Sequence, residues 1–144
     1  MSNMLTLKCK QLHSEAKVPK FALAHDAGLD LCAREVIKFA PGERKGIATG
    51  LAFAIPEGYV GLIWDKSGIA LKRGLKTMGG VIDAGYRGEV IVIAKNLSPE
   101  TLVFSAGEKV AQLLIQKVEH PLVEEVSELP ESERGESAFG STGL

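Results

Sequence analysis

The sequence predicts an all-β domain that contains one short helix. Its 144 residues are enough for a single domain with its own core, and a composition of 45% hydrophobic and 24% charged residues is that of a globular protein. Turn-forming residues recur at intervals of roughly eight to twelve residues, and short runs rich in β-branched and aliphatic residues lie between them. This pattern is typical of a β-sandwich or β-barrel and not of alternating strands and helices.

Each short apolar run predicts a strand. Residues 5–10 alternate in polarity, which puts Leu5, Leu7 and Cys9 on one face. The further runs that predict strands are residues 51–55, 59–64, 90–94, 101–104 and 110–118. Only residues 67–73, where apolar residues stand together between glycines, predict a helix.

Two of the expected strands also predict an oligomer. Residues 89–94 and 110–115 are apolar on both faces, so each strand needs to be covered on both sides. A sandwich of this size does not supply that cover alone. Burial against further copies of the chain supplies it, and we therefore expect a homo-oligomer.

The composition changes at Ser127, after which Gly, Ser and Glu predominate. Such a segment does not order by itself, which favours a frayed tail. It nevertheless carries Arg134, suited to a phosphate, and Phe139, suited to stacking, among glycines that allow it to bend. We therefore divide the chain into a β domain, residues 1–126, and a flexible C-terminal arm, residues 127–144.

The charge of the chain limits its partners. The net charge is −1, and the lysines and arginines are spread along the whole chain. No basic face for direct DNA or RNA binding is expected, whereas a nucleotide needs only a few local cations. Cys9 and Cys32 show no metal spacing and are expected to be free thiols in a reducing compartment. No apolar run has the length of a signal peptide or a membrane span, so we expect a cytoplasmic protein without a membrane partner.

Two segments carry candidate chemistry. At residues 65–68 a lysine, a serine and a glycine stand where the helix begins, and the free N–H groups of a helix start suit a phosphate. Ser67 is equally suited to be a simple helix cap, and this segment alone favours that role. Residues 79–90 form a strand, a turn and a return strand, in which Asp83 is either a turn residue or a functional one. Paired glycines before the strand indicate close approach of a flat ligand, with Tyr86 as a wall.

The hairpin resembles the third motif of the trimeric deoxyuridine triphosphatase (dUTPase) family, in which an Asp-x-x-Tyr turn holds the deoxyuridine. Four further segments resemble the remaining motifs in the family's order: residues 27–33 the first, 66–70 the second, 107–113 the fourth and 134–143 the fifth. This resemblance covers nearly the full chain. It implies a distorted β jelly roll assembled as a homotrimer, with active sites at the subunit interfaces and the tail of one subunit closing over the pocket of another.

The resemblance also implies an activity, the hydrolysis of dUTP to dUMP and pyrophosphate with Mg²⁺. It places uracil against the main chain of Gly80, Val81 and Ile82, with Ile91 opposite. Tyr86 is expected to lie under the deoxyribose and to exclude a ribose 2′-hydroxyl.

The same resemblance assigns the reacting groups. Asp83 is expected to orient and deprotonate the water that attacks the α-phosphorus, since water is a poor nucleophile at neutral pH. The residues expected to hold the phosphates are Lys66, Ser67, Gly68 and Gln112. Asp30 is expected to help position the magnesium ion through water, while the triphosphate holds the ion directly.

The arm completes the implied site. Arg134 is expected to contact phosphate and Phe139 to stack on uracil. Gly140, Ser141 and Thr142 belong to the glycine-rich fifth motif, in which Ser141 and Thr142 are expected to reach the terminal phosphate.

The chain departs from the family pattern at two places. Lys66 stands where the second motif usually has arginine, and lysine supplies a charge without a bidentate fork. Ser137 and Ala138 stand where the fifth motif usually has two glycines, so the arm bends less freely.

Two alternatives remain. A dCTP deaminase, or a bifunctional deaminase-triphosphatase, shares the implied fold but needs a further carboxylate facing the cytosine amino group. A non-catalytic nucleotide-binding relative does not need the water-activating Asp83.

Overall fold

The expected all-β architecture with one helix is confirmed by a computed structural model, which describes residues 3–140 and 143. The strands are β1 (Lys8–Gln11), β2 (Leu29–Cys32), β3 (Ile37–Phe39), β4 (Arg44–Ala48), β5 (Leu51–Ala54), β6 (Tyr59–Trp64), β7 (Leu75–Met78), β8 (Val81–Ile82), β9 (Ile91–Asn96), β10 (Leu102–Phe104) and β11 (Lys109–Lys117), and the helix is α1 (Ser67–Arg73). The two-residue length of β8 and the three-residue lengths of β3 and β10 reflect the frequent turns in the sequence.

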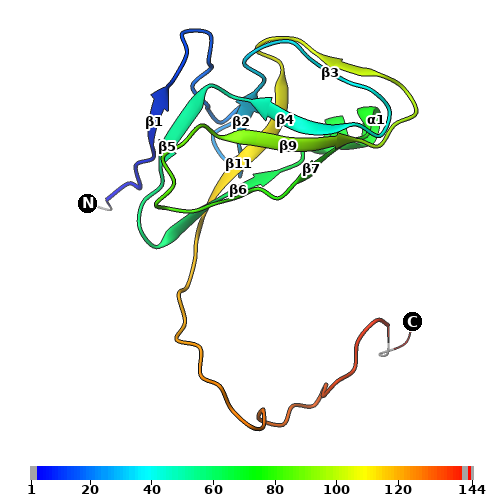
Figure 1. Ribbon diagram of the computed structural model, residues 1–144. Helices are drawn as coiled ribbons and strands as arrows, with labels where there is room; N and C mark the ends of the chain where they lie inside the picture. Colours follow the sequence, from blue (N-terminus) through cyan, green and yellow to red (C-terminus); the bar gives the residue numbers. More distant parts are fainter. Residues whose placement is uncertain (1–2, 141–142, 144) are drawn as a thin grey trace.

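The strands form four small antiparallel sheets (Figure 1). The largest has the order β2-β11-β6-β8, and a second has the order β4-β9-β7. β1 pairs with β5, and β3 pairs with β10. β11, the longest strand of the described chain, lies between β2 and β6, so both of its edges are hydrogen-bonded.

β5 contributes both faces to the core, since Leu51, Ala52 and Phe53 are all buried, whereas β9 contributes one face. In β9, Val92 and Ala94 are fully buried, while Ile91 and Ile93, on the opposite face, are 39% and 44% exposed. β9, which is apolar on both faces, is therefore covered on one face only within a single chain, whereas Val110 and Ala111 of β11, adjacent in sequence, are both buried.

Local structure agrees with the sequence at some elements and differs at others. The helix has the predicted bounds and ends at Gly74, whose left-handed φ of 72° suits glycine. The proposed cap role of Ser67 is wrong, because Lys66 occupies the N-cap position and no side chain caps the helix. The first strand begins at Lys8 rather than at residue 5, and Leu5 is exposed. No helix among the described residues is long and apolar enough to cross a membrane.

The C-terminal segment leaves the sheets after β11. It runs away from the body of the chain in an extended path (Figure 1). All described residues from Glu119 onward are exposed, including the apolar Leu122 and Val123, which cover nothing in their own chain.

The buried side chain of Asn96 joins the end of β9 to the end of β3 and to the loop before β10. The Asn96 side chain donates hydrogen bonds to the carbonyl oxygens of Phe39, Ala40 and Glu100 and accepts two from Ser98, through its amide and its hydroxyl. Asn96 is inaccessible to solvent, so water cannot take the place of its side chain as the hydrogen-bond partner of these groups.

We expect Asn96→Ala to lower the free energy of unfolding by about 3 kcal/mol, because it leaves several buried polar groups without partners. The neighbouring Leu97→Ala, at a side chain that is 64% exposed, serves as the control and should change stability by less than about 0.5 kcal/mol. Urea unfolding monitored by circular dichroism measures both. Equal stability of Asn96→Ala and the parent would contradict this role.

Candidate active site

The register of β11 brings three of the recognised segments together. Gln112 lies opposite Asp30 of β2 on one side and opposite Trp64 of β6 on the other. Its side-chain amide donates a hydrogen bond of 2.8 Å to the carbonyl oxygen of Asp65. A Cβ at Gly28 would lie 2.3 Å from Gln112 Oε1, so the glycine provides the space for this side chain. The segments of Asp30, Lys66 and Gln112, far apart in sequence, are thereby adjacent.

Asp30 is the electrostatic centre of this cluster. Lys66 Nζ lies 2.5 Å from its Oδ1, and Lys109 Nζ lies 2.9 Å from its Oδ2. Burial by itself would raise the pKa of Asp30, but the hydrogen bonds and charges of the two lysines outweigh burial and hold the pKa below its ordinary value. The hydrogen bond to Asp30 and the negative charge of Asp30 in turn raise the pKa of Lys109. Asp30 is therefore a buried carboxylate that fixes the position of two ammonium groups.

Lys66 remains able to bind a ligand in this arrangement. Its ammonium group has three protons, and the bond to Asp30 uses one of them. The preceding Asp65 has a different role, because its carboxylate accepts the backbone N–H of Thr77 and pairs with Lys76. Asp65 thus fixes the strand-to-helix turn from which Lys66, Ser67 and Gly68 project.

The predicted hairpin is held tightly against β6. The Gly80 carbonyl accepts a hydrogen bond of 2.8 Å from the backbone N–H of Ile63, and a Cβ at Gly80 would lie 2.8 Å from the Ile63 carbonyl oxygen. Gly80 also has a φ of 98°, which favours glycine. At the other end of the turn, the Tyr86 hydroxyl donates to the carbonyl oxygen of Glu89 at 3.0 Å, and its ring lies where a Cβ at Gly88 would stand. The turn therefore presents Tyr86 in one orientation.

These residues enclose a pocket of about 220 Å³. Its lining residues are Val81, Ile82, Asp83, Tyr86, Glu89 and Ile91. Within the described chain no hydrogen bond or ion pair engages the Asp83 carboxylate. The pocket thus combines apolar walls, one aromatic ring and an available carboxylate.

Glu89 is a pocket residue that the sequence analysis did not identify, because it was treated as the start of an apolar strand. Its Oε1 accepts the backbone N–H of Gly50 at 3.0 Å and lies 3.9 Å from a guanidinium nitrogen of Arg34. These contacts anchor the return strand of the hairpin to the turn between β4 and β5. The signal in the sequence that could have identified Glu89 was a carboxylate beside the turn, in an otherwise apolar run.

A single chain forms two separate groups of candidate residues. No side-chain hydrogen bond or ion pair joins Asp83 or Tyr86 to the cluster of Asp30, Lys66 and Gln112 in the part of the chain that the structure describes. The arm joins neither group, because all of its described residues are exposed. Arg134 donates to the carbonyl oxygen of Ser137, and the Phe139 side chain, next to Gly140, is fully exposed. Ser141 and Thr142 lie outside the described residues.

The residues present suit a magnesium ion held mainly by a ligand. Among residues 3–140 and 143, no three His, Cys, Asp or Glu side chains are grouped to form a cation site. Both oxygens of Asp30 are engaged by ammonium groups, which argues against direct ligation. Each oxygen retains a lone pair for a metal-bound water, so the donor set fits an outer role for Asp30.

An all-β domain with cations at a helix start, and with a carboxylate in an aromatic-walled pocket, has the features of an enzyme acting on a phosphorylated small molecule. Comparison with known proteins makes this specific. The dUTPase family model matches residues 14–143, and the chain belongs to the dUTPase family. Family membership assigns it to the dUTP diphosphatases.

Individual relatives agree with this assignment. Deoxyuridine 5′-triphosphate nucleotidohydrolase of Rhodococcus erythropolis is 43% identical over 146 residues, which cover 99% of this chain and 89% of that protein. The enzyme of the same name from Clostridium kluyveri is 43% identical over 141 residues, which cover 96% and 99%. Among solved structures, the Staphylococcus bacteriophage 80alpha dUTPase with dUpNHpp superposes with a TM-score of 0.88 at 33% identity, covering 98% of this chain and all of that one.

The lowered pKa of Asp30 predicts a pH-dependent contribution to stability. A carboxyl group whose pKa is depressed in the folded state stabilises it above the unfolded pKa of about 3.9, and this contribution is lost as the pH falls through the folded value. We expect Asp30→Asn to be less stable than the parent at pH 7, with a gap that narrows as the pH falls below about 4. Urea unfolding across this pH range measures the gap, with the exposed Glu57→Gln as the control. A gap of constant size would contradict the ion-pair origin.

Proposed function

We propose that this chain hydrolyses dUTP to dUMP and pyrophosphate as a Mg²⁺-dependent homotrimer in the cytoplasm. The observation that carries the proposal is the position of Asp83 in the pocket beside Tyr86, where its carboxylate has no partner among the described residues. The named relatives are deoxyuridine 5′-triphosphate nucleotidohydrolases, and the phage 80alpha enzyme is similar over the whole chain.

Uracil is recognised by the backbone of β8. Within the described residues this strand is at the edge of its sheet and pairs with β6 alone, so the main-chain groups on its other side have no strand partner there. The peptide groups of Gly80, Val81 and Ile82 pair with the edge of the base, and Ile91 faces it across the pocket. Cytosine offers the opposite donor pattern and leaves a backbone group unpaired, which is a strong form of discrimination.

Tyr86 selects the sugar. Its hydroxyl is held by the Glu89 carbonyl oxygen, so the ring does not turn away when a nucleotide enters. The ring packs under the deoxyribose and occupies the space that a ribose 2′-hydroxyl requires. UTP is excluded by this contact.

Asp83 acts as the general base. It accepts a proton from a water molecule while the water oxygen attacks the α-phosphorus, and the bond from this phosphorus to the bridging oxygen of the departing pyrophosphate breaks. The products are dUMP and pyrophosphate. A carboxylate without a competing protein partner is suited to hold this water.

Lys66, Ser67, Gly68 and Gln112 hold the phosphates. Lys66 is kept in position by Asp30 and donates its remaining protons to phosphate oxygens. Magnesium would neutralise charge on the triphosphate when bound, and Asp30 would help to hold the ion through water. Positive charge and N–H donors that are in place before reaction stabilise the charge that spreads over the phosphoryl oxygens.

Assembly completes the site. In the described part of one chain no side-chain bond joins the Asp83 pocket to the Lys66 cluster, and the exposed side chain of Ile93 offers surface for a neighbour. The arm of one subunit closes over the site of another, with Arg134, Ser141 and Thr142 at the phosphates and Phe139 on the base. The fold thus supports a site shared between subunits.

The deaminase alternative gains no support from the second carboxylate of the pocket. Glu89 is engaged by the Gly50 amide and lies close to Arg34, so it serves the structure of the hairpin and not proton transfer to a cytosine.

We expect Asp83→Asn to bind dUTP while kcat falls by ~10²–10⁴-fold, because the substitution keeps the shape but removes the base. Pyrophosphate release measures turnover, and equilibrium dialysis with dUTP measures binding. Glu57→Gln, which also replaces an exposed carboxylate, should keep the parental kcat. Near-normal turnover in Asp83→Asn would reduce Asp83 to a turn residue.

Removal of residues 133–144 should leave the trimer folded, because β11 ends at Lys117, and should lower catalysis by orders of magnitude. Mixing the truncated protein with full-length Asp83→Asn, under conditions of subunit exchange, should restore part of the activity. Some mixed sites then combine an intact Asp83 with an intact arm. Light scattering establishes the trimer mass, and absence of recovery despite proven exchange would exclude an arm that serves a neighbouring subunit.

A further inference from the structure

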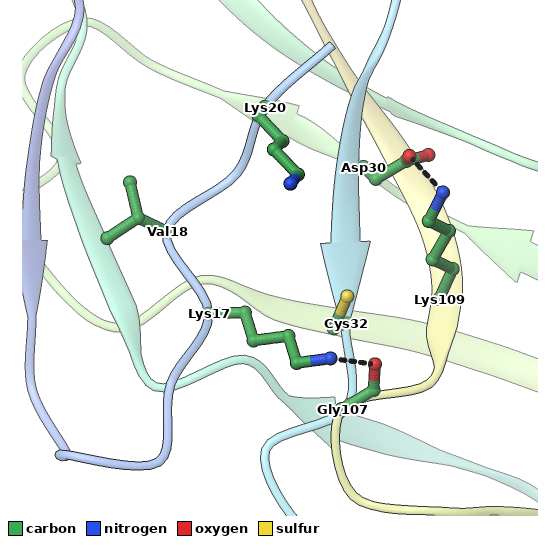
Figure 2. A pocket seen from close by; sticks show the side chains of 7 residues that line it. All are labelled: Lys17, Val18, Lys20, Asp30, Cys32, Gly107 and Lys109. Carbon is green, nitrogen blue, oxygen red and sulfur yellow. Dashed lines mark hydrogen bonds and ion pairs between the residues drawn. The ribbon is translucent and has the colours of Figure 1, made fainter. Parts of the chain in front are cut away.

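A cavity of about 360 Å³ lies beside β2 and does not include the Asp83 pocket (Figure 2). It is formed by the segment that precedes β2, by β2 itself and by the turn that leads into β11. Its lining residues are Lys17, Val18, Lys20, Asp30, Cys32, Gly107 and Lys109. Its volume is within the range of about 300–1,000 Å³ that is usual for small-molecule sites.

The walls of this cavity are fixed by the backbone. The Asp30 N–H donates to the Lys20 carbonyl oxygen, which holds the preceding segment against β2. The Gly107 N–H donates to the Ala33 carbonyl oxygen at 2.7 Å, which holds the turn before β11 against the other end of β2. The cavity therefore lies between connected elements and not between loose loops.

Glycine at position 107 is needed for one wall. Gly107 has a φ of 80°, and a Cβ there would lie 2.8 Å from both Cε and Nζ of Lys17. The Lys17 ammonium group donates to the Gly107 carbonyl oxygen at 3.0 Å (Figure 2). The side chain is thus held across the turn with two of its protons still available.

The cavity carries an excess of positive charge. Asp30 is its one carboxylate, and that charge is already matched by Lys109 on one oxygen and Lys66, outside the cavity, on the other. Lys17 and Lys20 have no carboxylate partner among the residues that the structure describes. In Figure 2 their side chains extend from the N-terminal segment toward β2. Three ammonium groups thus surround a space that contains one shared negative charge.

We propose that this cavity is a second anion site, which binds a phosphate-type dianion. Ammonium groups with free protons bind phosphate oxygens by charge-assisted hydrogen bonds, and a dianion matches the two lysines that lack a carboxylate. Orthophosphate is such a dianion at mildly alkaline pH, and pyrophosphate offers the same phosphate oxygens with a higher negative charge. Lys109 borders both this site and Asp30, so the bound anion lies next to the Lys66 cluster without using Asp83 or Tyr86.

Cys32 provides a local reporter for the site, because it lines the cavity and is partly exposed. In a Cys9→Ser background it is the chain's only thiol. Its alkylation by the neutral reagent iodoacetamide is followed by mass spectrometry at mildly alkaline pH. Sodium chloride keeps the ionic strength constant while orthophosphate or pyrophosphate is titrated.

We expect either phosphate to slow alkylation along a saturation curve, because the bound anion blocks access to the thiol. In K17Q/K20Q the half-saturating concentration should rise by about tenfold or more, since two charged donors are lost. K38Q/K117Q removes two exposed lysines that lie outside the cavity and should leave the curve unchanged. Isothermal titration calorimetry of phosphate with the same three proteins should give the same order of affinities.

Equal slowing by chloride at matched ionic strength would overturn the proposal, as would an unchanged saturation curve and unchanged calorimetric affinity in K17Q/K20Q. A lower half-saturating concentration for pyrophosphate than for orthophosphate would identify the preferred anion. The test does not depend on dUTP hydrolysis, and Asp83→Asn should retain full protection of Cys32. Failure of the anion site and failure of the proposed activity are therefore distinguishable.

Discussion

The structure depends on the register of β11 between β2 and β6. A strand bonded on both edges cannot shift by one residue without turning Val110, Ala111 and Leu113 away from their present positions, all of which are buried. This constraint places Gln112 next to Asp30 and next to the end of β6, from which Lys66 follows. β6 in turn carries β8 and the Asp83 hairpin. Burial of ordinary apolar residues on one strand thus brings together polar groups from distant segments of the chain.

Asp30 is the second constraint, and it acts through charge. Loss of hydration disfavours the burial of a charged carboxylate. Asp30 stays ionised while buried because both lysines pair with it. In return it holds two long and flexible side chains in fixed positions. Lysine lacks the forked geometry of arginine, and the bond to Asp30 supplies Lys66 with the orientation that its own side chain does not determine. In the proposed site, this orientation would offset the missing fork of the arginine that the family pattern usually has at Lys66.

The sequence predicted what is local and missed what is contributed by distant residues. The single helix and the Asp83–Tyr86 turn follow from glycine placement and short-range patterns. β2, β3, β4 and β7 were not predicted, because their alternation is weak and their stability comes from partner strands. The pairing of Asp30 with Lys66 and Lys109 and the anchoring of Glu89 by Gly50 connect residues that are far apart in sequence, and periodicity carries no information on such contacts. The order of the motifs predicted the candidate site residues but not which of them meet within one chain.

The arm shows how composition and proposed role agree. Leu122 and Val123 are apolar yet 95% and 89% exposed, and Phe139 is fully exposed. Burial of such apolar side chains is favourable, but it requires another surface to cover them. In the proposed trimer that surface belongs to a neighbour and, at the end of the arm, to the nucleotide itself. Ordering the arm costs conformational entropy, and in the proposed trimer the contacts that offset this cost form fully only when substrate is present. Closure of the site is then coupled to substrate binding, so that water is excluded only when there is a triphosphate to hydrolyse.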